Sequence, residues 1–162
     1  MAQERWKPSV TVAAVIERDG RYLLVEEMTP EGLRLNNPAG HLDPGESLLQ
    51  AVVRETLEET ARPFVPEALT GIHLARLDRP QTGEDITYLR FAFCGAVGEE
   101  IAGRVLDTPV VRTLWMSLDE VRSSTARHRS PLVLQCVNEH AAGQRFPMAV
   151  LSTHPSVALL QK

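Results

Sequence analysis

The sequence has few cysteines and no long apolar run. Cys94 and Cys136 are its only cysteines, and neither belongs to a CxxC pair or a Cys/His cluster, which argues against a zinc site. Both are expected to be buried, reduced thiols. No stretch approaches the ~18 apolar residues needed to span a bilayer, and the opening MAQERWKPSV lacks the apolar core of a signal peptide. These absences predict a cytoplasmic protein without membrane segments.

Lysine is also nearly absent, and the charge balance is mildly acidic. The net charge is -4, with 15 arginines against only Lys7 and Lys162. Proteins that bind nucleic acid or anionic lipid over a broad surface need a basic face, so neither partner is expected. Arginine is the better donor fork for phosphate and carboxylate oxygens, although GC-rich coding gives the same bias. We therefore expect a small-molecule ligand; the oligomeric state is not fixed by the sequence, and a monomer is compatible with it.

The strand pattern begins with a hairpin. Two β-rich runs, 10–16 and 22–26, flank Asp19-Gly20, a pair that supplies the positive φ of a tight turn. The segment NNPAGHLDPGE is rich in Pro and Gly and predicts a loop or a very short strand. Three later runs rich in β-formers predict further strands: ALTGIHLARL, ITYLRFAFCGAV and VVRTLWMSL. Within them, Phe91, Phe93 and Trp115 are expected in the core.

The helix signals complete the predicted architecture. Ser47 and Gln50 fit a capping box, which predicts a helix from Ser47 to about Ala61. A short helix is expected to open at 117–120, and a last one to run from 130 to 142. The order β-β-α-β-β-β-α-α, without strict alternation, predicts an α/β protein of the α+β type: a mixed sheet packed between helices in one domain, residues 1–162.

The first predicted helix carries an unusual set of acidic residues. Glu55, Glu58 and Glu59 lie three or four residues apart, and like charges at that spacing cost a helix about 0.2–0.5 kcal/mol per pair. One interpretation is a solvated face balanced by Arg54 and Arg62, each four residues from Glu58. The preceding loop favours a second interpretation, in which the carboxylates hold a divalent metal ion. Glycines there let the backbone approach an ion, and carboxylate and carbonyl oxygens are the ligands of hard cations such as Mg²⁺.

The same residues carry a family resemblance. Gly40, Glu46, Arg54-Glu55 and Glu58-Glu59 stand at the spacing of the Nudix box, the signature of hydrolases that act on a nucleoside diphosphate linked to another moiety. Three positions depart from the usual pattern, because Thr56 and Arg62 replace aliphatic residues and Ala61 replaces a glycine. These departures affect packing and the end of the helix rather than the carboxylates.

The resemblance implies a fold, a cofactor and residue roles. It implies a Nudix-type mixed sheet sandwiched between helices and an Mg²⁺ cofactor, with Mn²⁺ as the alternative. Metal ligands would be Glu55, Glu58, Glu59 and the Gly40 carbonyl, with Glu55 either a ligand or the base that activates water. Arg54 would pair with Glu46 and hold the helix against the loop. The implied site is thus Glu46, Arg54, Glu55, Glu58 and Glu59, together with Gly40.

Three stretches, KPSVTVAAVIERDGRYLLVEE, NNPAGHLDPGESLLQAVVRETLEET and RSPLVLQCVNEHAAGQRFP, resemble the NudJ-type phosphatases of the family, so the similarity runs from about residue 7 to residue 147. Members of that branch act on nucleoside di- and triphosphates and on the pyrophosphate of a thiamin precursor, hydroxymethylpyrimidine. Two alternatives remain within the fold: a catalytically weak nucleotide sensor, or a pyrophosphatase specific for a dinucleotide or nucleotide sugar. An isoprenoid diphosphate isomerase would need a catalytic cysteine in a loop, whereas Cys94 lies in an apolar strand.

Other polar residues remain open. The base lies outside the box in some Nudix families, and the nearest acidic candidates are Glu84, Asp85, Glu99 and Glu100. Basic residues able to contact phosphate are Lys7, Arg90 and the run Arg127-His128-Arg129. Each of these is interpreted more simply as a solvated charge or a helix-end partner.

Overall fold

The computed structural model describes residues 5–160, with side chains to residue 158. Residues 1–4 of the opening stretch lie outside the described residues. The described chain contains three α-helices and seven strands. The helices are α1 (Leu48–Thr60), α2 (Leu118–Ser123) and α3 (Leu132–Ala141). The strands are β1 (Ser9–Arg18), β2 (Arg21–Thr29), β3 (Gly32–Asn36), β4 (Ala39–His41), β5 (Phe64–Arg79), β6 (Glu84–Val97) and β7 (Val110–Ser117).

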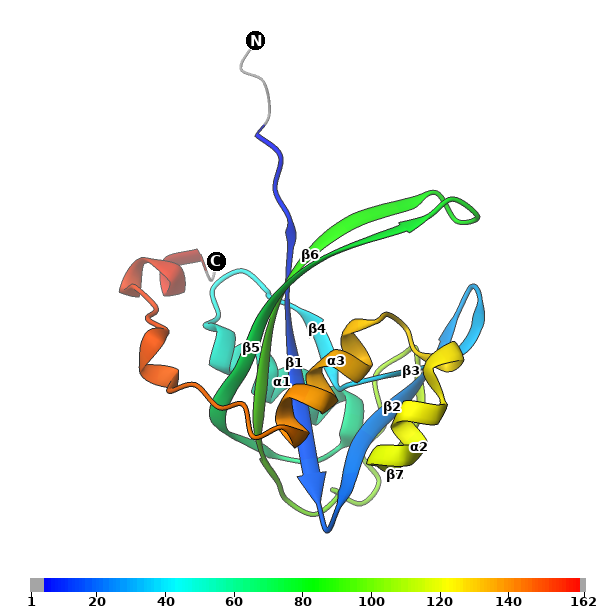
Figure 1. Ribbon diagram of the computed structural model, residues 1–162. Helices are drawn as coiled ribbons and strands as arrows, with labels where there is room; N and C mark the ends of the chain where they lie inside the picture. Colours follow the sequence, from blue (N-terminus) through cyan, green and yellow to red (C-terminus); the bar gives the residue numbers. More distant parts are fainter. Residues whose placement is uncertain (1–4, 161–162) are drawn as a thin grey trace.

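The strands form one mixed sheet in the order β3-β2-β1-β6-β5 (Figure 1). β1 runs parallel to β6 and antiparallel to β4, and β2 pairs with β3 and β7. The predicted hairpin is confirmed, since β1 and β2 meet at a turn where Asp19 and Gly20 both have positive φ. This arrangement places the short strand β4 beside the central strand, where it leads directly into the loop before α1.

Two apolar clusters lie on opposite faces of the sheet. Val12 and Phe93 pack with residues of α1, whereas Val15 and Cys94 pack with residues of α3. Because neighbouring strand residues point to opposite faces, α1 and α3 cover opposite sides of β1 and β6. The predicted mixed sheet between helices is confirmed. Phe91, Phe93 and Trp115 lie in or against the cluster on the α1 side, and both cysteines are buried and free, as expected.

Some elements differ from the sequence prediction. β3 was not expected, and β5 and β6 are longer than predicted: they continue as a two-stranded arm beyond the body of the sheet (Figure 1). The arm is held by cross-strand ion pairs such as Arg76 with Asp85 and Arg79 with Glu84. Charged pairs of this kind carry no apolar alternation, so the strand signal fades in the sequence before the strands end.

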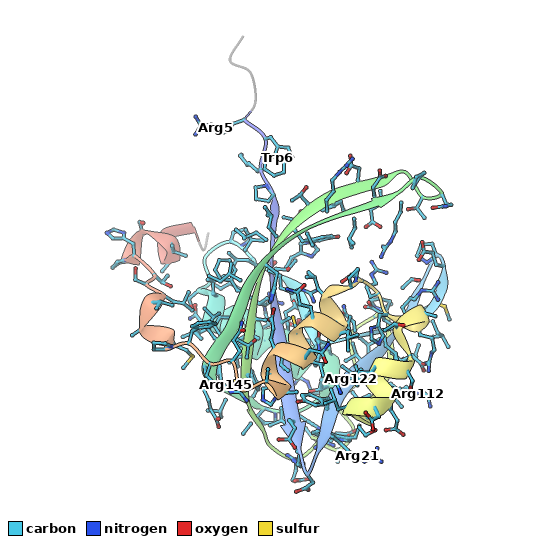
Figure 2. All side chains as sticks on the ribbon, viewed as in Figure 1. Arg5, Trp6, Arg21, Arg112, Arg122 and Arg145 are labelled. Carbon is cyan, nitrogen blue, oxygen red and sulfur yellow. The ribbon has the colours of Figure 1, made fainter. Side chains whose placement is uncertain are left out.

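Labelled side chains mark the two ends of the molecule. Figure 2 shows Arg5 and Trp6 on the extended segment that leads into β1, with Trp6 largely exposed. Arg21, Arg112 and Arg122 lie at the end of the molecule formed by β2, β7 and α2. Within residues 5–160, no helix is long and apolar enough to cross a membrane.

Candidate active site

The helix α1 begins where the sequence predicts. The hydroxyl of Ser47 accepts from the backbone N–H of Gln50, and the Gln50 side chain accepts from the Ser47 N–H, which completes the capping box. The helix ends at Ala61, which takes the left-handed conformation (φ 55°) of the glycine usual there. Thr56 is buried, and its hydroxyl donates to the Val52 carbonyl. The departures from the Nudix pattern are therefore accommodated without displacing the acidic residues.

Arg54 joins the helix to the preceding loop. Its Nε and Nη2 donate to the two carboxylate oxygens of Glu46 at 3.0 and 2.7 Å, and Nη2 also donates to the His41 carbonyl at 2.9 Å. Burial is the largest single influence and acts to raise the pKa of Glu46, but the hydrogen bonds from Arg54 and the Asp43 backbone, together with the charge of Arg54, hold that pKa below its usual range. The pairing of Arg54 with Glu46 that the resemblance implies is present as a two-pronged ion pair, the geometry that a lysine does not reproduce.

The third nitrogen of Arg54 faces the other acidic residues. Nη1 donates to Glu55 at 2.8 Å and to Glu58 at 3.1 Å. Burial, opposed by Arg54 and reinforced by the neighbouring charge of Glu58, raises the pKa of the Glu55 carboxyl. A single guanidinium thus lies within ion-pair distance of four carboxylates, those of Asp43, Glu46, Glu55 and Glu58, so the site carries more negative charge than this arginine neutralises.

Glu59 is the most deeply buried of these acids. Its side chain accepts from the Ala39 N–H at 2.9 Å, which fixes it against β4. Burial, with repulsion from Glu55 and other nearby carboxylates, raises the pKa of Glu59 to about 8. A carboxylate in this setting is unfavourable as an anion unless a cation lies beside it.

Gly40 and Glu55 are in unusually close contact. A Cβ added to Gly40 would lie 2.1 Å from the Glu55 carboxyl carbon, closer than any real contact. The glycine therefore lets the carboxyl group of α1 lie directly against the backbone of β4. This proximity places the backbone of the box glycine beside an acidic side chain of the helix.

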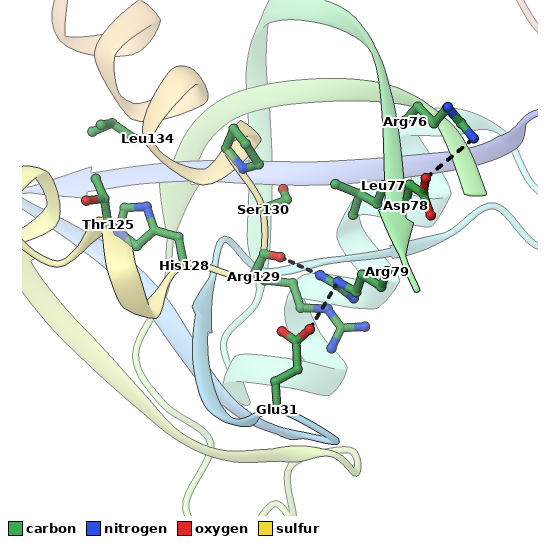
Figure 3. Close-up of a pocket in the computed structure, with 11 residues that line it drawn as sticks. Glu31, Arg76, Leu77, Asp78, Arg79, Thr125, His128, Arg129, Ser130 and Leu134 are labelled. Atoms are coloured by element: carbon green, nitrogen blue, oxygen red, sulfur yellow. Dashed lines mark hydrogen bonds and ion pairs between the residues drawn. The ribbon is translucent and has the colours of Figure 1, made fainter. Parts of the chain in front are cut away.

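These residues line a cavity of about 470 Å³. Gly40, Arg54, Glu55 and Glu59 contribute one part of its wall, and Tyr88, Leu77 and Leu132 are among the residues of the rest. Glu58, turned toward Arg54, is not among the lining residues. A second cavity, of about 500 Å³, adjoins it and shares Leu77, Arg129 and Ser130 (Figure 3). Figure 3 shows Arg79 of the arm bonded to the Arg129 carbonyl in this second cavity.

The donor set fits a hard divalent cation. As the side chains stand in residues 5–160, no three acidic, His or Cys groups converge on one point. The chemistry nevertheless matches, because three carboxylates on one turn of helix lie beside a glycine backbone, and burial raises the pKa of both Glu55 and Glu59. A nearby divalent charge would favour both carboxylates as anions. Glu55, Glu58, Glu59 and the Gly40 carbonyl remain the predicted ligands.

The four acidic candidates outside the box lie elsewhere. Glu84 and Asp85 pair with arginines of the arm, and Glu99 and Glu100 lie in ion pairs with Arg18 and Arg62. None of the four lines the cavity.

The cavity contains Glu27, which the sequence did not suggest, and two arginines that the sequence offered as phosphate contacts but for which a solvated position was the simpler interpretation. Glu27 is buried and lines it, and burial, opposed by nearby arginines, raises the pKa of this carboxyl. Arg90 was expected to be a solvated charge, but it is 8% exposed and lines the same cavity. Arg129 also lies there, 3.6 Å from Glu27. The available signal was the position of Arg90 within an apolar strand, where a charged residue is seldom solvated.

Comparisons with known proteins agree with the resemblance to the Nudix family that the box residues indicate. The sequence model of the NUDIX domain matches residues 5–136. The chain is 32% identical over 146 residues to "Phosphatase NudJ" of Escherichia coli strain K12, covering 90% of this chain and 92% of that protein. A "NUDIX hydrolase from Nitrosomonas europaea" is 51% identical, with a TM-score of 0.84 over 91% of this chain and 98% of that one. A MutT NUDIX hydrolase from Burkholderia pseudomallei, 23% identical with a TM-score of 0.65, shares the fold over 83% of this chain and 98% of its own.

Proposed function

The chain belongs to the NUDIX domain family and is a hydrolase, and we propose that it cleaves phosphoric anhydride bonds in nucleoside di- and triphosphates in an Mg²⁺-dependent reaction. Related small pyrophosphates, such as that of the thiamin precursor hydroxymethylpyrimidine, belong to the same proposal, and Mn²⁺ is the alternative metal. The observation that carries it is the complete set of box residues, with Arg54 bonded to Glu46 and with Glu55 and Glu59 facing a cavity.

The size of the cavity and the relatives support this substrate class. At about 470 Å³, the cavity falls within the range of about 300–1,000 Å³ usual for small-molecule sites. The similar protein from Escherichia coli is named a phosphatase. Arginines and carboxylates line one cavity together, a combination suited to an anionic ligand that arrives with a divalent cation.

The chain's own residues divide the work of hydrolysis. Glu55, Glu58, Glu59 and the Gly40 carbonyl would hold Mg²⁺, which when bound neutralises charge on the phosphoryl oxygens. Arg54 and Glu46 fix the helix against the loop, so that these acids keep their positions relative to β4. Glu59 is further held by the Ala39 N–H. Positioning of this kind supplies much of the rate in phosphoryl transfer.

The attacking water must also lose a proton. Glu55, half-buried and facing the cavity, is one candidate for the base. Glu27 is the other, because it lines the same cavity and burial raises its pKa toward the range in which a carboxylate accepts protons well. Glu27 thereby replaces the four candidates outside the box that the sequence suggested.

A phosphate-release panel tests the proposal. The substrates are nucleoside di- and triphosphates, a dinucleotide, a nucleotide sugar and hydroxymethylpyrimidine pyrophosphate, each assayed with Mg²⁺ or with EDTA. We expect wild-type activity on simple di- or triphosphates, and a loss of at least about a hundredfold in Glu59→Gln, which removes a buried carboxylate but keeps its shape. Glu99→Gln, at a side chain 91% exposed, is the matched control and should retain full activity.

Other outcomes separate the alternatives. Glu59→Gln turnover equal to that of wild type would refute the role given to this residue. Activity confined to the dinucleotide or the nucleotide sugar would replace the substrate class with a narrower one. Binding of nucleotides without turnover in wild type would identify a sensor.

A further inference from the structure

The arm formed by the ends of β5 and β6 has little connection to the core of the protein. β1 pairs with β6 only from Tyr88 onward, so within the described sheet residues 76–79 and 84–87 have no strand partner except each other. Neither apolar cluster contains a residue of this part. A two-stranded hairpin is only marginally stable by itself in water. Contacts with the body of the protein must therefore fix where the arm lies.

One face of the arm forms part of the wall of the candidate site. Leu77 lines both the cavity beside α1 and the second cavity, and Tyr88, at the base of the arm, lines the first. Arg79 lies two residues beyond Leu77, on the same face of the strand, and lines the second cavity. A movement of the arm away from the body would therefore remove one wall from both cavities.

Arg79 is the residue that joins the arm to the body. Its Nη2 donates to the backbone carbonyl of Arg129 at 2.7 Å, and its Nε lies 3.9 Å from a carboxylate oxygen of Glu31 in the turn between β2 and β3 (Figure 3). Its Nη1 donates to Glu84 of the opposite strand at 2.7 Å, and the side chain is only 15% exposed. Among the described residues, no other side chain of residues 76–87 forms a hydrogen bond or an ion pair with the body.

The acceptor of this bond is itself fixed in the body. The N–H of Arg129 donates to the Leu35 carbonyl at 2.8 Å, which holds the segment before α3 against β3. The Arg129 side chain lies 3.6 Å from Glu27, the buried acid that lines the candidate site. A hydrogen bond from a charged donor to a fixed acceptor changes an equilibrium constant about tenfold or more. The single bond from Arg79 is therefore strong enough to decide the position of the arm.

We propose that Arg79 is a positioning residue that latches the arm over the candidate site, so that the protein exchanges between the closed arm of this structure and an open one. The proposal rests on the proposed function, since it takes the substrate to lie between the arm and α1. The open form admits the substrate, and the closed form gives it the wall that contains Leu77 and Tyr88. Loss of Arg79 lowers the population of the closed form and leaves the carboxylates of α1 in place.

Distances between two spin labels test the latch without turnover. One label is attached at Gln81→Cys, in the exposed turn of the arm, and the other at Ser123→Cys, exposed at the end of α2, while the native Cys94 and Cys136 are buried. Double electron–electron resonance should give one main distance for the otherwise wild-type protein. Arg79→Met should add a longer distance, with the ratio of open to closed arms raised at least about tenfold.

The matched control is a second ion pair of the same arm. Asp85→Asn breaks the exposed pair with Arg76, which joins the two strands to each other but not to the body, so the distances should stay at their wild-type values. The arm contributes to neither apolar cluster, so Arg79→Met is expected to fold. If it does not, Arg79→Lys decides the outcome. This variant keeps one charged donor but loses the fork that bonds Glu84 and the Arg129 carbonyl together, and its open population should be intermediate.

Steady-state kinetics connects the arm to the candidate site. When only the closed form binds substrate fully, the apparent affinity falls by the same factor as the closed fraction. For a substrate found in the phosphate-release panel, the KM of Arg79→Met should rise by the factor that the spin labels give, while kcat stays within about threefold of wild type. A role in stability alone would not produce this agreement between two independent measurements.

Each contrary result has a distinct meaning. Wild-type distances in Arg79→Met would overturn the latch, and so would an equal opening in Asp85→Asn. An open arm with unchanged KM, or a fall in kcat at unchanged KM, would overturn the connection between the arm and the site. A wild type that hydrolyses no substrate of the panel would refute the proposed function, while the spin-label distances would still decide whether Arg79 holds the arm.

Discussion

Replacing Gly40 with alanine tests whether the Glu55 carboxyl must lie against β4. The new Cβ would stand 2.1 Å from the Glu55 carboxyl carbon and Oε1, and 2.3 Å from Oε2. Ordinary carbon contacts are about 3.5 Å, so the carboxyl group must retreat by more than about 1 Å. The atoms in conflict are the end of a flexible side chain, and Gly40 does not have the positive φ that would strain an alanine. We therefore expect the acid to move and the backbone to stay.

Gly40→Ala is expected to lower the catalytic rate strongly while leaving the free energy of unfolding almost unchanged. Displacing Glu55 weakens an ion pair with Arg54 worth about 0–1 kcal/mol, while replacing glycine by alanine gains about 0.4–1 kcal/mol through the unfolded chain. The free energy of unfolding should thus change by less than about 1 kcal/mol. A catalytic group misplaced by about 1 Å costs about a hundredfold in rate.

The assay measures kcat for phosphate release and Tm on the same preparation, with Gly98→Ala as control. A Cβ at Gly98 would meet only Pro63, at 3.5 Å, which is ordinary contact, so both quantities should stay at wild-type values. Full activity in Gly40→Ala would refute the placement of Glu55. A Tm that falls by more than about 5 °C would show that the backbone moves instead.

Two further predictions concern ion pairs. Arg54→Lys keeps the charge but cannot hold Glu46 and Glu58 through separate nitrogens. We expect kcat to fall at least about tenfold, while the free energy of unfolding falls by only about 1 kcal/mol. A wild-type kcat in this variant would contradict the role given to Arg54. The Arg112 hydrogen bond holds the pKa of buried Glu26 below its usual value of 4.5. A lowered pKa contributes stability above pH 4.5 that is lost as pH falls through the folded pKa, so Glu26→Gln should be less stable than wild type at pH 7 in urea, with a gap that narrows toward pH 3. A gap that widens on acidification would reverse this reasoning.

Local signals predicted the parts of the fold that depend on local chemistry. The hairpin at Asp19-Gly20 and the capping box at Ser47 are confirmed, because each is determined by residues within a few positions of one another. The pair of Arg54 with Glu46 was implied by the resemblance to the Nudix family, and the structure contains it. Strand β3 was missed although Pro30 and Gly32 are typical turn residues, because its five residues, which pair with β2, give only a short strand pattern.

The polar wall of the cavity required the tertiary structure. Arg90, Thr11 and Asn36 lie on three strands far apart in the sequence, and only the sheet order brings β1 beside β6 and joins β2 to β3. In the sequence, Arg90 is one of 15 arginines and resembles a surface charge. Its burial follows from register, which pairs it with Thr11 on the inner strand.

Several residues that line this cavity contain groups that fit poorly in the folded protein alone. Glu59 is buried with a raised pKa, and Arg90, Thr11 and Asn36 each keep an atom without a partner. Buried Glu26, which does not line the cavity, is matched within the chain by Arg112. Local conflicts of this kind persist in natural sequences mainly where a ligand resolves them. A divalent cation beside the Glu55 and Glu59 carboxylates would resolve the conflict at that part of the wall, because it would favour both groups as anions.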